Sequence, residues 1–121
     1  MAWRIEVTHD AVEDQRRIFR HLFEIHRREF GHGPSEAADK AERRSRAIDA
    51  GIVRIAKAVH IGTRHVIQGH EFRHLTIDRA IYWFTLDEAA RCVRIEAIFF
   101  GGQDHVARML DRLSARTEGG G

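Results

Sequence analysis

The chain has 121 residues, of which 43% are hydrophobic and 31% are charged, and its formal net charge is +2. This length supports one hydrophobic core and is short for two, so we expect a single domain. No apolar run approaches the roughly 20 residues that span a bilayer, and the first residues, MAWRIEVTHD, lack the apolar segment of a signal peptide. We therefore expect a cytoplasmic protein that does not contact membranes.

Cysteine and arginine usage bear on the compartment and the partners. The lone Cys92 cannot form an internal disulfide and has no second thiol with which to bind zinc, in agreement with a reducing compartment. Of the 20 basic residues, 18 are arginine, whose guanidinium groups suit carboxylates and phosphates equally well. This bias permits an acidic protein partner or a nucleic acid, and GC-rich coding alone would also produce it.

The first half of the sequence predicts a strand followed by a helical hairpin. Residues 3–7 alternate apolar and polar side chains, which is the pattern of a half-buried strand. Thr8 or Asp10 then caps a helix that runs to about residue 30. After a break rich in glycine and proline, a second helix is expected over about 35–59. Two amphipathic helices joined by so short a loop should pack as an antiparallel hairpin.

The second half predicts an antiparallel meander and a last helix. Strands are expected at residues 64–68, 71–77, 79–86 and 91–100. Along the last of these, Val93, Ile95, Ala97 and Phe99 are expected to face the core and the hairpin. Ile98 and Phe100 then lie uncovered on the opposite face, which is left free for a partner or a substrate.

The C-terminal segment has helical spacing from its cap at Asp104 onwards. Its apolar stripe, which we expect to dock on the domain, consists of Val106, Met109, Leu110 and Leu113. Arg108, Arg112 and Arg116 repeat at spacing four and are expected on the outer side of this helix. They are either a target contact or simply a solvated helix face.

Three segments resemble the ParE branch of the RelE/ParE toxin superfamily: WRIEVTHDAVEDQRRIFRHL, EFRHLTIDRAIYWF and VRIEAIFFGGQDHVARML. The resemblance covers most of the chain in the right order, whereas residues 34–58 fit only as a generic second helix. It implies an α+β fold with an N-terminal strand, an α-helical hairpin, a mostly antiparallel sheet of four to five strands and a short C-terminal helix. The first strand should lie beside the last. One ParE-like toxin domain over residues 1–116 would be followed by a disordered tail, 117–121.

The resemblance also implies the toxin of a type II toxin–antitoxin module. Its partner would be a ParD-like ribbon-helix-helix antitoxin whose C-terminal segment wraps the toxin, and operator DNA would be contacted only through that antitoxin. ParE-like members poison DNA gyrase, whereas RelE-like members cleave messenger RNA on the ribosome. We expect a gyrase poison that acts by binding and not as an enzyme. The alternatives are a ribosome-dependent endoribonuclease that uses Arg73, Arg94 and His105, and a degenerate toxin that retains only antitoxin binding.

The end of the last strand bears on this choice. Cleavage of RNA through its 2′-hydroxyl needs a base, an acid and cations around the phosphate. Nucleases of the superfamily commonly place histidine, tyrosine, arginine or lysine there, but this chain has Phe100, which can neither transfer a proton nor hold an anion. We therefore assign no catalytic residue. Contacts with the antitoxin or the target are expected at Arg73, Trp83, Arg94, Phe100, Arg108, Arg112 and Arg116.

For Arg73 the sequence allows a second role, and for Trp83 the expected exposure depends on which face of its strand it occupies. Arg73 could equally form a structural salt bridge that anchors the sheet edge. Tyr82 and Trp83 point to opposite faces of one strand, so at least one belongs to the core, and we expect Trp83 to be exposed as an anchor for a partner.

Nine histidines suggest a metal site, but their spacing argues against one. On a strand, His70 and His74 would lie about 13 Å apart, too far to share an ion. Neither His60 nor His65 completes a helical chelating pair with them. We expect neither a metal nor a cofactor.

Overall fold

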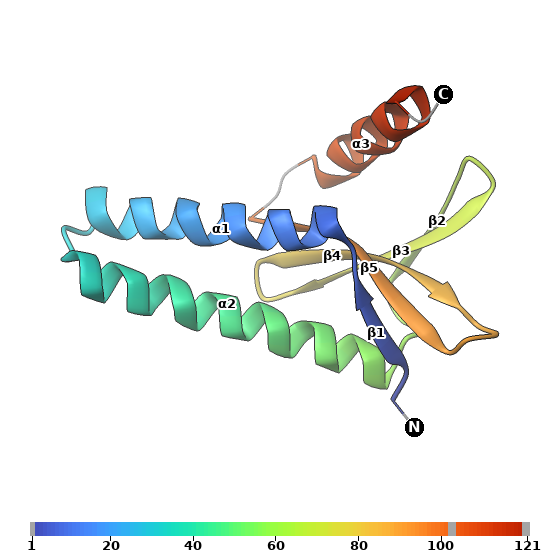
Figure 1. The fold of residues 1–121 in the computed structure, drawn as a ribbon, viewed down its shortest axis with the longest axis horizontal. Coiled ribbons are helices and arrows are strands. Elements are labelled where there is room, and N and C mark those ends of the chain that lie inside the picture. The colour runs from blue at the N-terminus through green and yellow to red at the C-terminus, as the bar shows by residue number, and fades with distance from the viewer. Residues whose placement is uncertain (1, 102–103, 120–121) are drawn as a thin grey trace.

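The computed structural model describes residues 2–101 and 104–119 (Figure 1). In chain order its elements are β1 (Arg4–Val7), α1 (His9–Arg28), α2 (Pro34–Lys57), β2 (Thr63–Ile67), β3 (His70–Ile77), β4 (Ala80–Asp87), β5 (Cys92–Phe100) and α3 (His105–Gly119). The strands form one sheet in the order β1-β5-β4-β3-β2, in which β1 is parallel to β5 and the other neighbours are antiparallel. This topology confirms the predicted α+β fold, with the first strand beside the last.

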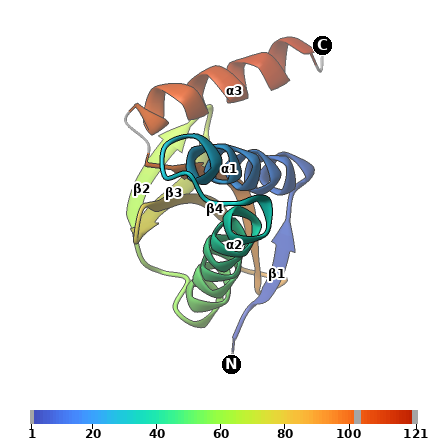
Figure 2. The same ribbon diagram turned by 90° about the vertical axis from the view of Figure 1, so that its left-hand side faces the viewer.

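Local sequence explains where the hairpin helices begin. Thr8 is the N-cap of α1, because its Oγ1 accepts a hydrogen bond from the Ala11 N–H at 3.2 Å. Pro34 occupies the first turn of α2, where its missing N–H leaves no helical bond unmade. The two helices lie side by side and antiparallel (Figure 1, Figure 2), as predicted. Within the described ranges, none of the helices has the length and apolarity needed to cross a membrane.

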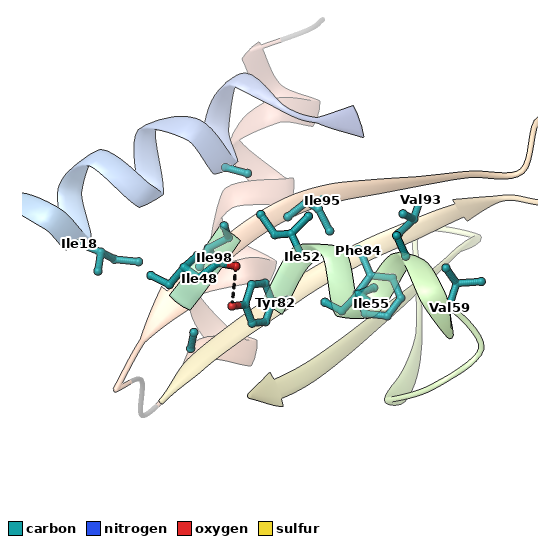
Figure 3. Packing of buried hydrophobic residues seen from close by; sticks show 13 residues of the cluster. Ile18, Ile48, Ile52, Ile55, Val59, Tyr82, Phe84, Val93, Ile95 and Ile98 are labelled. Atoms are coloured by element: carbon teal, nitrogen blue, oxygen red, sulfur yellow. Dashed lines mark hydrogen bonds between the residues drawn. The ribbon is translucent and has the colours of Figure 1, made fainter. Parts of the chain in front are cut away.

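The hairpin packs on one face of the sheet and buries the main core (Figure 3). This core joins Ile18, Ile48, Ile52, Ile55, Tyr82, Phe84, Val93, Ile95 and Ile98. The Tyr82 hydroxyl donates to the carbonyl of Ile48 at 3.0 Å, so the buried phenol is satisfied. Burial raises the pKa of Tyr82 to about 12. Gly51 makes this contact possible, because a Cβ at that position would collide with the Tyr82 hydroxyl.

Strand β5 contains a β-bulge that the alternating sequence pattern did not predict. Trp83 of β4 pairs with Ala97, whereas the next residue, Phe84, pairs with Ile95. Glu96 is therefore the extra residue, and the facing pattern of β5 reverses beyond it.

The bulge corrects the predicted faces of this strand. Ala97 and Phe99 turn away from the hairpin and join a second cluster on the opposite face of the sheet. Ile98 takes their place against the hairpin and is 1% exposed, so the prediction that it is uncovered was wrong.

Helix α3 covers part of the sheet face opposite the hairpin. In both views α3 and α2 lie on opposite sides of α1 (Figure 1, Figure 2). Met109 and Leu113 pack into the second cluster around Trp83, as predicted. Val106 and Leu110 were also expected to dock, but they are 37% and 42% exposed. The helix continues through Gly119, and residues 120 and 121 of the predicted tail lie outside the described residues.

Candidate functional site

Three histidines and a tryptophan meet on the sheet face that α3 partly covers. His65 lies on β2, His74 on β3 and Trp83 on β4, while His105 is the first residue of α3. His74 pairs directly with Trp83 across the two strands, so both side chains point to the same face. We call these four residues the histidine cluster.

The rings of the histidine cluster touch one another. Nε2 of His65 lies 2.7 Å from Nδ1 of His74, and the indole N–H of Trp83 donates to Nδ1 of His105 at 3.1 Å. The ring centroids of His74 and His105 are 4.6 Å apart. Those of His65 and His74 lie 4.7 and 5.2 Å from the Trp83 ring. Trp83 is 0% exposed and the imidazoles are half-buried, so the indole forms the floor of a surface lined by imidazoles.

The surroundings of His74 and His105 favour the neutral form of both imidazoles. Burial lowers the pKa of His74, and the neighbouring His105 and His65 lower it further. Burial, and then His65, lower the pKa of His105 as well. Since an indole N–H can only donate, Nδ1 of neutral His105 accepts and the proton sits on Nε2. The cluster thus presents both proton acceptors and N–H donors, as general acid–base chemistry requires.

The sequence did not reveal this cluster because its members come from different strands. We compared His70 with His74 along one strand, whereas the neighbour of His74 is His65 on the adjacent strand. His65 lies opposite Phe72, one diagonal step from His74, and only the strand register brings the two imidazoles together. Across residues 2–101 and 104–119, no group of three or more His, Cys, Asp or Glu side chains is placed to hold a metal ion.

Two of the predicted contact residues, Trp83 and Arg73, are largely buried. Trp83 was expected to be exposed and is instead fully buried, because α3 and the imidazoles cover it. Arg73 points to the hairpin face, since it pairs with the core residue Phe84. Its side chain is 12% exposed, and its guanidinium group donates to the carbonyl of Ile61 at 3.4 Å and lies 3.8 Å from a carboxylate oxygen of Glu71. These contacts match the structural alternative stated for Arg73.

Arg94 lies on the sheet face of the histidine cluster but in an ion-paired network of its own. Its Nε is 3.7 Å from a carboxylate oxygen of Glu6 and 3.6 Å from one of Glu96. Burial raises the pKa of Glu96, and Arg94 opposes that shift. Half of the Arg94 side chain remains exposed.

Phe100 lies on the other face, away from the histidine cluster. It packs against the hairpin core, and the guanidinium carbons of Arg44 and Arg79 lie 5.2 and 5.4 Å from its ring centroid. Phe100 is half-buried, so the prediction that this side chain is uncovered was wrong in part.

The arginine row of α3 was predicted on the outer side of the helix, and Arg108 and Arg116 are exposed there, whereas Arg112 is half-buried. Arg112 makes two hydrogen bonds of 2.8 Å to the buried carboxylate of Asp14, which holds the pKa of Arg112 above its usual value. Arg116 contacts Asp10 at 2.6 Å, and this hydrogen bond lowers the pKa of Asp10. The third member, Arg108, lies 5.1 Å from the ring centroid of a sheet phenylalanine. The row therefore fastens α3 to α1 and to the sheet.

Comparison with known proteins places this geometry in a known fold. No protein-family model matches the chain, and no curated protein matches it significantly. Among solved structures, it is similar to a chain of the toxin–antitoxin complex RelBE2 from Mycobacterium tuberculosis, with a TM-score of 0.52 and 9% sequence identity. The similarity covers 83% of this chain and 92% of that one. The chain has a RelE-type toxin fold.

This RelE-type toxin fold confirms the fold that the sequence resemblance implied for the superfamily as a whole. Membership of the ParE branch stays a prediction. Within the RelE-type toxin fold, the histidine cluster lies on the sheet face opposite the hairpin, and Phe100 lies on the hairpin face.

Proposed function

We propose that this chain is the toxin component of a type II toxin–antitoxin module and is neutralised in the cytoplasm by a cognate antitoxin. The fold supports this proposal, because a chain of a toxin–antitoxin complex shares it over most of both lengths. The three sequence segments that resemble ParE toxins support it independently. A ParD-like ribbon-helix-helix protein is the partner that this resemblance implies, and operator DNA would be reached only through it.

We further propose that the toxin cleaves messenger RNA on the ribosome, which was the alternative reading of the sequence. One observation carries this choice: three contacting imidazoles, two of them with lowered pKa, lie at the surface of the sheet. In metal-independent cleavage, the 2′-oxygen attacks the adjacent phosphorus and the bond to the 5′-oxygen breaks. The products are a 2′,3′-cyclic phosphate and a 5′-hydroxyl.

The cluster offers a group for each proton transfer. Neutral His74 is suited to take the proton of the 2′-hydroxyl, and its hydrogen bond to His65 stabilises the imidazolium that forms. The leaving 5′-oxygen departs on the side of the phosphorus opposite the attacking 2′-oxygen, so a second group must protonate it. His105 is suited to that role, because its Nδ1 accepts the Trp83 indole N–H and its proton therefore sits on Nε2.

Poisoning of DNA gyrase is the second candidate, and one observation favours it. Phe100 at the end of β5 supplies no proton-transferring group, and it lies on the face away from the histidine cluster. The arginine row of α3 no longer supports this candidate, because Arg112 and Arg116 are engaged with Asp14 and Asp10.

Two assays on the purified chain separate the candidates. Cleavage of a transcript during translation by purified ribosomes is expected, with DNA supercoiling by gyrase left unchanged. Inhibition of supercoiling together with intact transcripts would instead establish the gyrase poison. Growth that continues normally during induced expression of the soluble chain would contradict the toxin function itself.

A further inference from the structure

A pocket of about 540 Å³ opens on the sheet next to the histidine cluster. It is lined by residues 70–72 of β3, by residues 85–88 at the end of β4, and by Arg94 and Glu96 of β5. We call it the Glu96 pocket. Phe72 links it to the cluster, because Phe72 lines the pocket and lies opposite His65 in the strand register. His74 is two residues further along β3 and therefore points to the same face as Phe72.

Glu96 is a buried carboxylate in the wall of this pocket. It is the extra residue of the β-bulge, a feature that redirects a side chain, and it is 7% exposed. Among residues 2–101 and 104–119, no group donates a hydrogen bond to its carboxylate, and Nε of Arg94 lies 3.6 Å from Oε1. A buried carboxylate without donors lowers stability. A ligand that brings N–H groups into the pocket would supply the donors that the fold does not.

The other carboxylates that line the pocket already have partners. Their hydrogen bonds join Glu71 to Arg64, Glu88 to His60, and Asp87 to the backbone N–H of Ala90. Among the described lining residues, Glu96 is therefore the carboxylate whose acceptor capacity is unused. Arg94 favours its ionised form, because the positive charge lowers the pKa that burial raises. The same charge would repel a lysine or arginine of a protein partner, so an uncharged donor suits the pocket better.

Of the four RNA bases, guanine matches an ionised carboxylate best. Its Watson–Crick edge carries two adjacent donors, N1–H and N2–H, and a carboxylate has two oxygens that can accept both. On the same edge, adenine and cytosine each place an acceptor beside their amino group. Uracil places its single N–H between two carbonyls. Each of these three bases would bring an acceptor oxygen or nitrogen against the carboxylate, which is unfavourable in a buried site.

We propose that the Glu96 pocket binds a guanine base of the RNA beside the cleaved bond, an inference that rests on the proposed ribonuclease function. The Glu96 carboxylate accepts N1–H and N2–H of the base, and Phe72 supplies an apolar wall. Because Phe72 adjoins His65 and His74, the guanine belongs to a nucleotide next to the scissile phosphate. Selection of guanine also explains why a carboxylate that lowers stability occupies this position.

Binding of short RNA to the purified chain tests the inference without any cleavage. The probes are fluorescent heptamers of 2′-O-methyluridine, which lack the attacking 2′-hydroxyl, with guanosine, adenosine, cytidine or inosine at the centre. The guanosine probe should bind the parent chain about tenfold more tightly than the adenosine and cytidine probes. Inosine lacks the 2-amino group and should lose most of this advantage, because only N1–H remains to pair with the carboxylate.

Two matched variants separate Glu96 from the general charge of the pocket. Glu96→Gln keeps the shape of the side chain and should bring the affinities of all four probes within about twofold of one another. Glu88→Gln makes the same chemical change on a pocket side chain that is 64% exposed and should leave the preference for guanosine intact.

Three results would overturn the inference. They are equal or undetectable affinity of the parent chain for the probes, a guanosine preference that survives Glu96→Gln, and an arginine-rich peptide that binds more tightly than the guanosine probe and competes with it. Cleavage of a translated transcript is a separate readout. Its absence in the parent chain would refute the ribonuclease function, whereas the affinities would still decide whether the pocket selects guanine. The cut sites of the parent should have guanine enriched at one fixed position, and those of Glu96→Gln should not.

Discussion

The ion pair between Arg112 and Asp14 gives a stability prediction whose size follows from burial. Asp14 is 4% exposed, and its carboxylate accepts the backbone N–H of Ile98 at 2.9 Å and both guanidinium contacts of Arg112 at 2.8 Å. Arg112→Ala would leave this carboxylate buried, with only the Ile98 N–H as a hydrogen-bond donor. The nearest remaining cation would be Arg17, whose Nη1 lies 3.7 Å from Oδ1 of Asp14. Breaking one side of a buried pair typically costs 3–5 kcal/mol, and the partial exposure of Arg112 places the expected loss near the lower limit, about 3 kcal/mol.

Arg116→Ala is the matched control for this experiment. The pair between Arg116 and Asp10 is on the same two helices, but its side chains are 37% and 45% exposed. An exposed pair contributes about 0.5 kcal/mol. Urea unfolding of both variants measures the two free energies, and a loss of about 3 kcal/mol corresponds to a fall of roughly 12 °C in Tm for a chain of this size. Equal and small losses in the free energy of unfolding of both variants would refute the conclusion that Arg112 holds α3 against α1.

Three further predictions follow from single sites. Glu96→Gln should stabilise the fold near neutral pH. Because the pKa of Glu96 is raised in the folded state, its contribution to stability is present at acid pH and is lost as pH rises through the folded pKa. The stability of the variant, measured by urea unfolding, should therefore depend less on pH than that of the parent. Gly51→Ala should destabilise the fold by about 2 kcal/mol in the same assay, because the added methyl group collides with Tyr82. In a variant whose other tryptophan is replaced, Trp83 fluorescence should change as pH falls below the 6.5 of an ordinary histidine, because protonation of His105 removes the acceptor of the indole hydrogen bond. Both histidines with lowered pKa, His74 and His105, contribute stability that is present above pH 6.5 and is lost as pH falls below it. Because the pKa of His105 is lowered from 6.5, a fluorescence change centred above pH 6.5 would contradict this interpretation.

Much of the fold could be predicted because its signals are local. The Thr8 cap, the proline at the start of α2 and the period-2 strands each depend on residues close in sequence, and all lie where the pattern indicated. The bulge at Glu96 could not be predicted, because nothing in the alternation of β5 distinguishes it from a regular strand.

The site was less accessible to sequence reasoning because it depends on long-range packing. Trp83 is buried by α3, which docks through the pairing of Arg112 with Asp14, 98 positions apart in the sequence. From the sequence alone, an arginine row such as that of α3 is placed on the solvent side of its amphipathic helix, because the sequence does not show that a buried carboxylate lies opposite it. His65 and His74 meet only through the register of β2 and β3.

Cleavage of a translated transcript by the purified toxin and its histidine variants tests the central claim most directly. His74→Ala and His105→Ala should each lower the single-turnover cleavage rate about 100-fold, the usual contribution of a general acid–base group. His70→Ala is the control, since it removes an exposed imidazole from the same strand and face outside the cluster. The account predicts that His70→Ala cleaves at the parent rate and that the rate of the parent falls as pH drops below the lowered pKa of His74. Cleavage that is equally fast in all three variants, or absent from the parent chain, would contradict it.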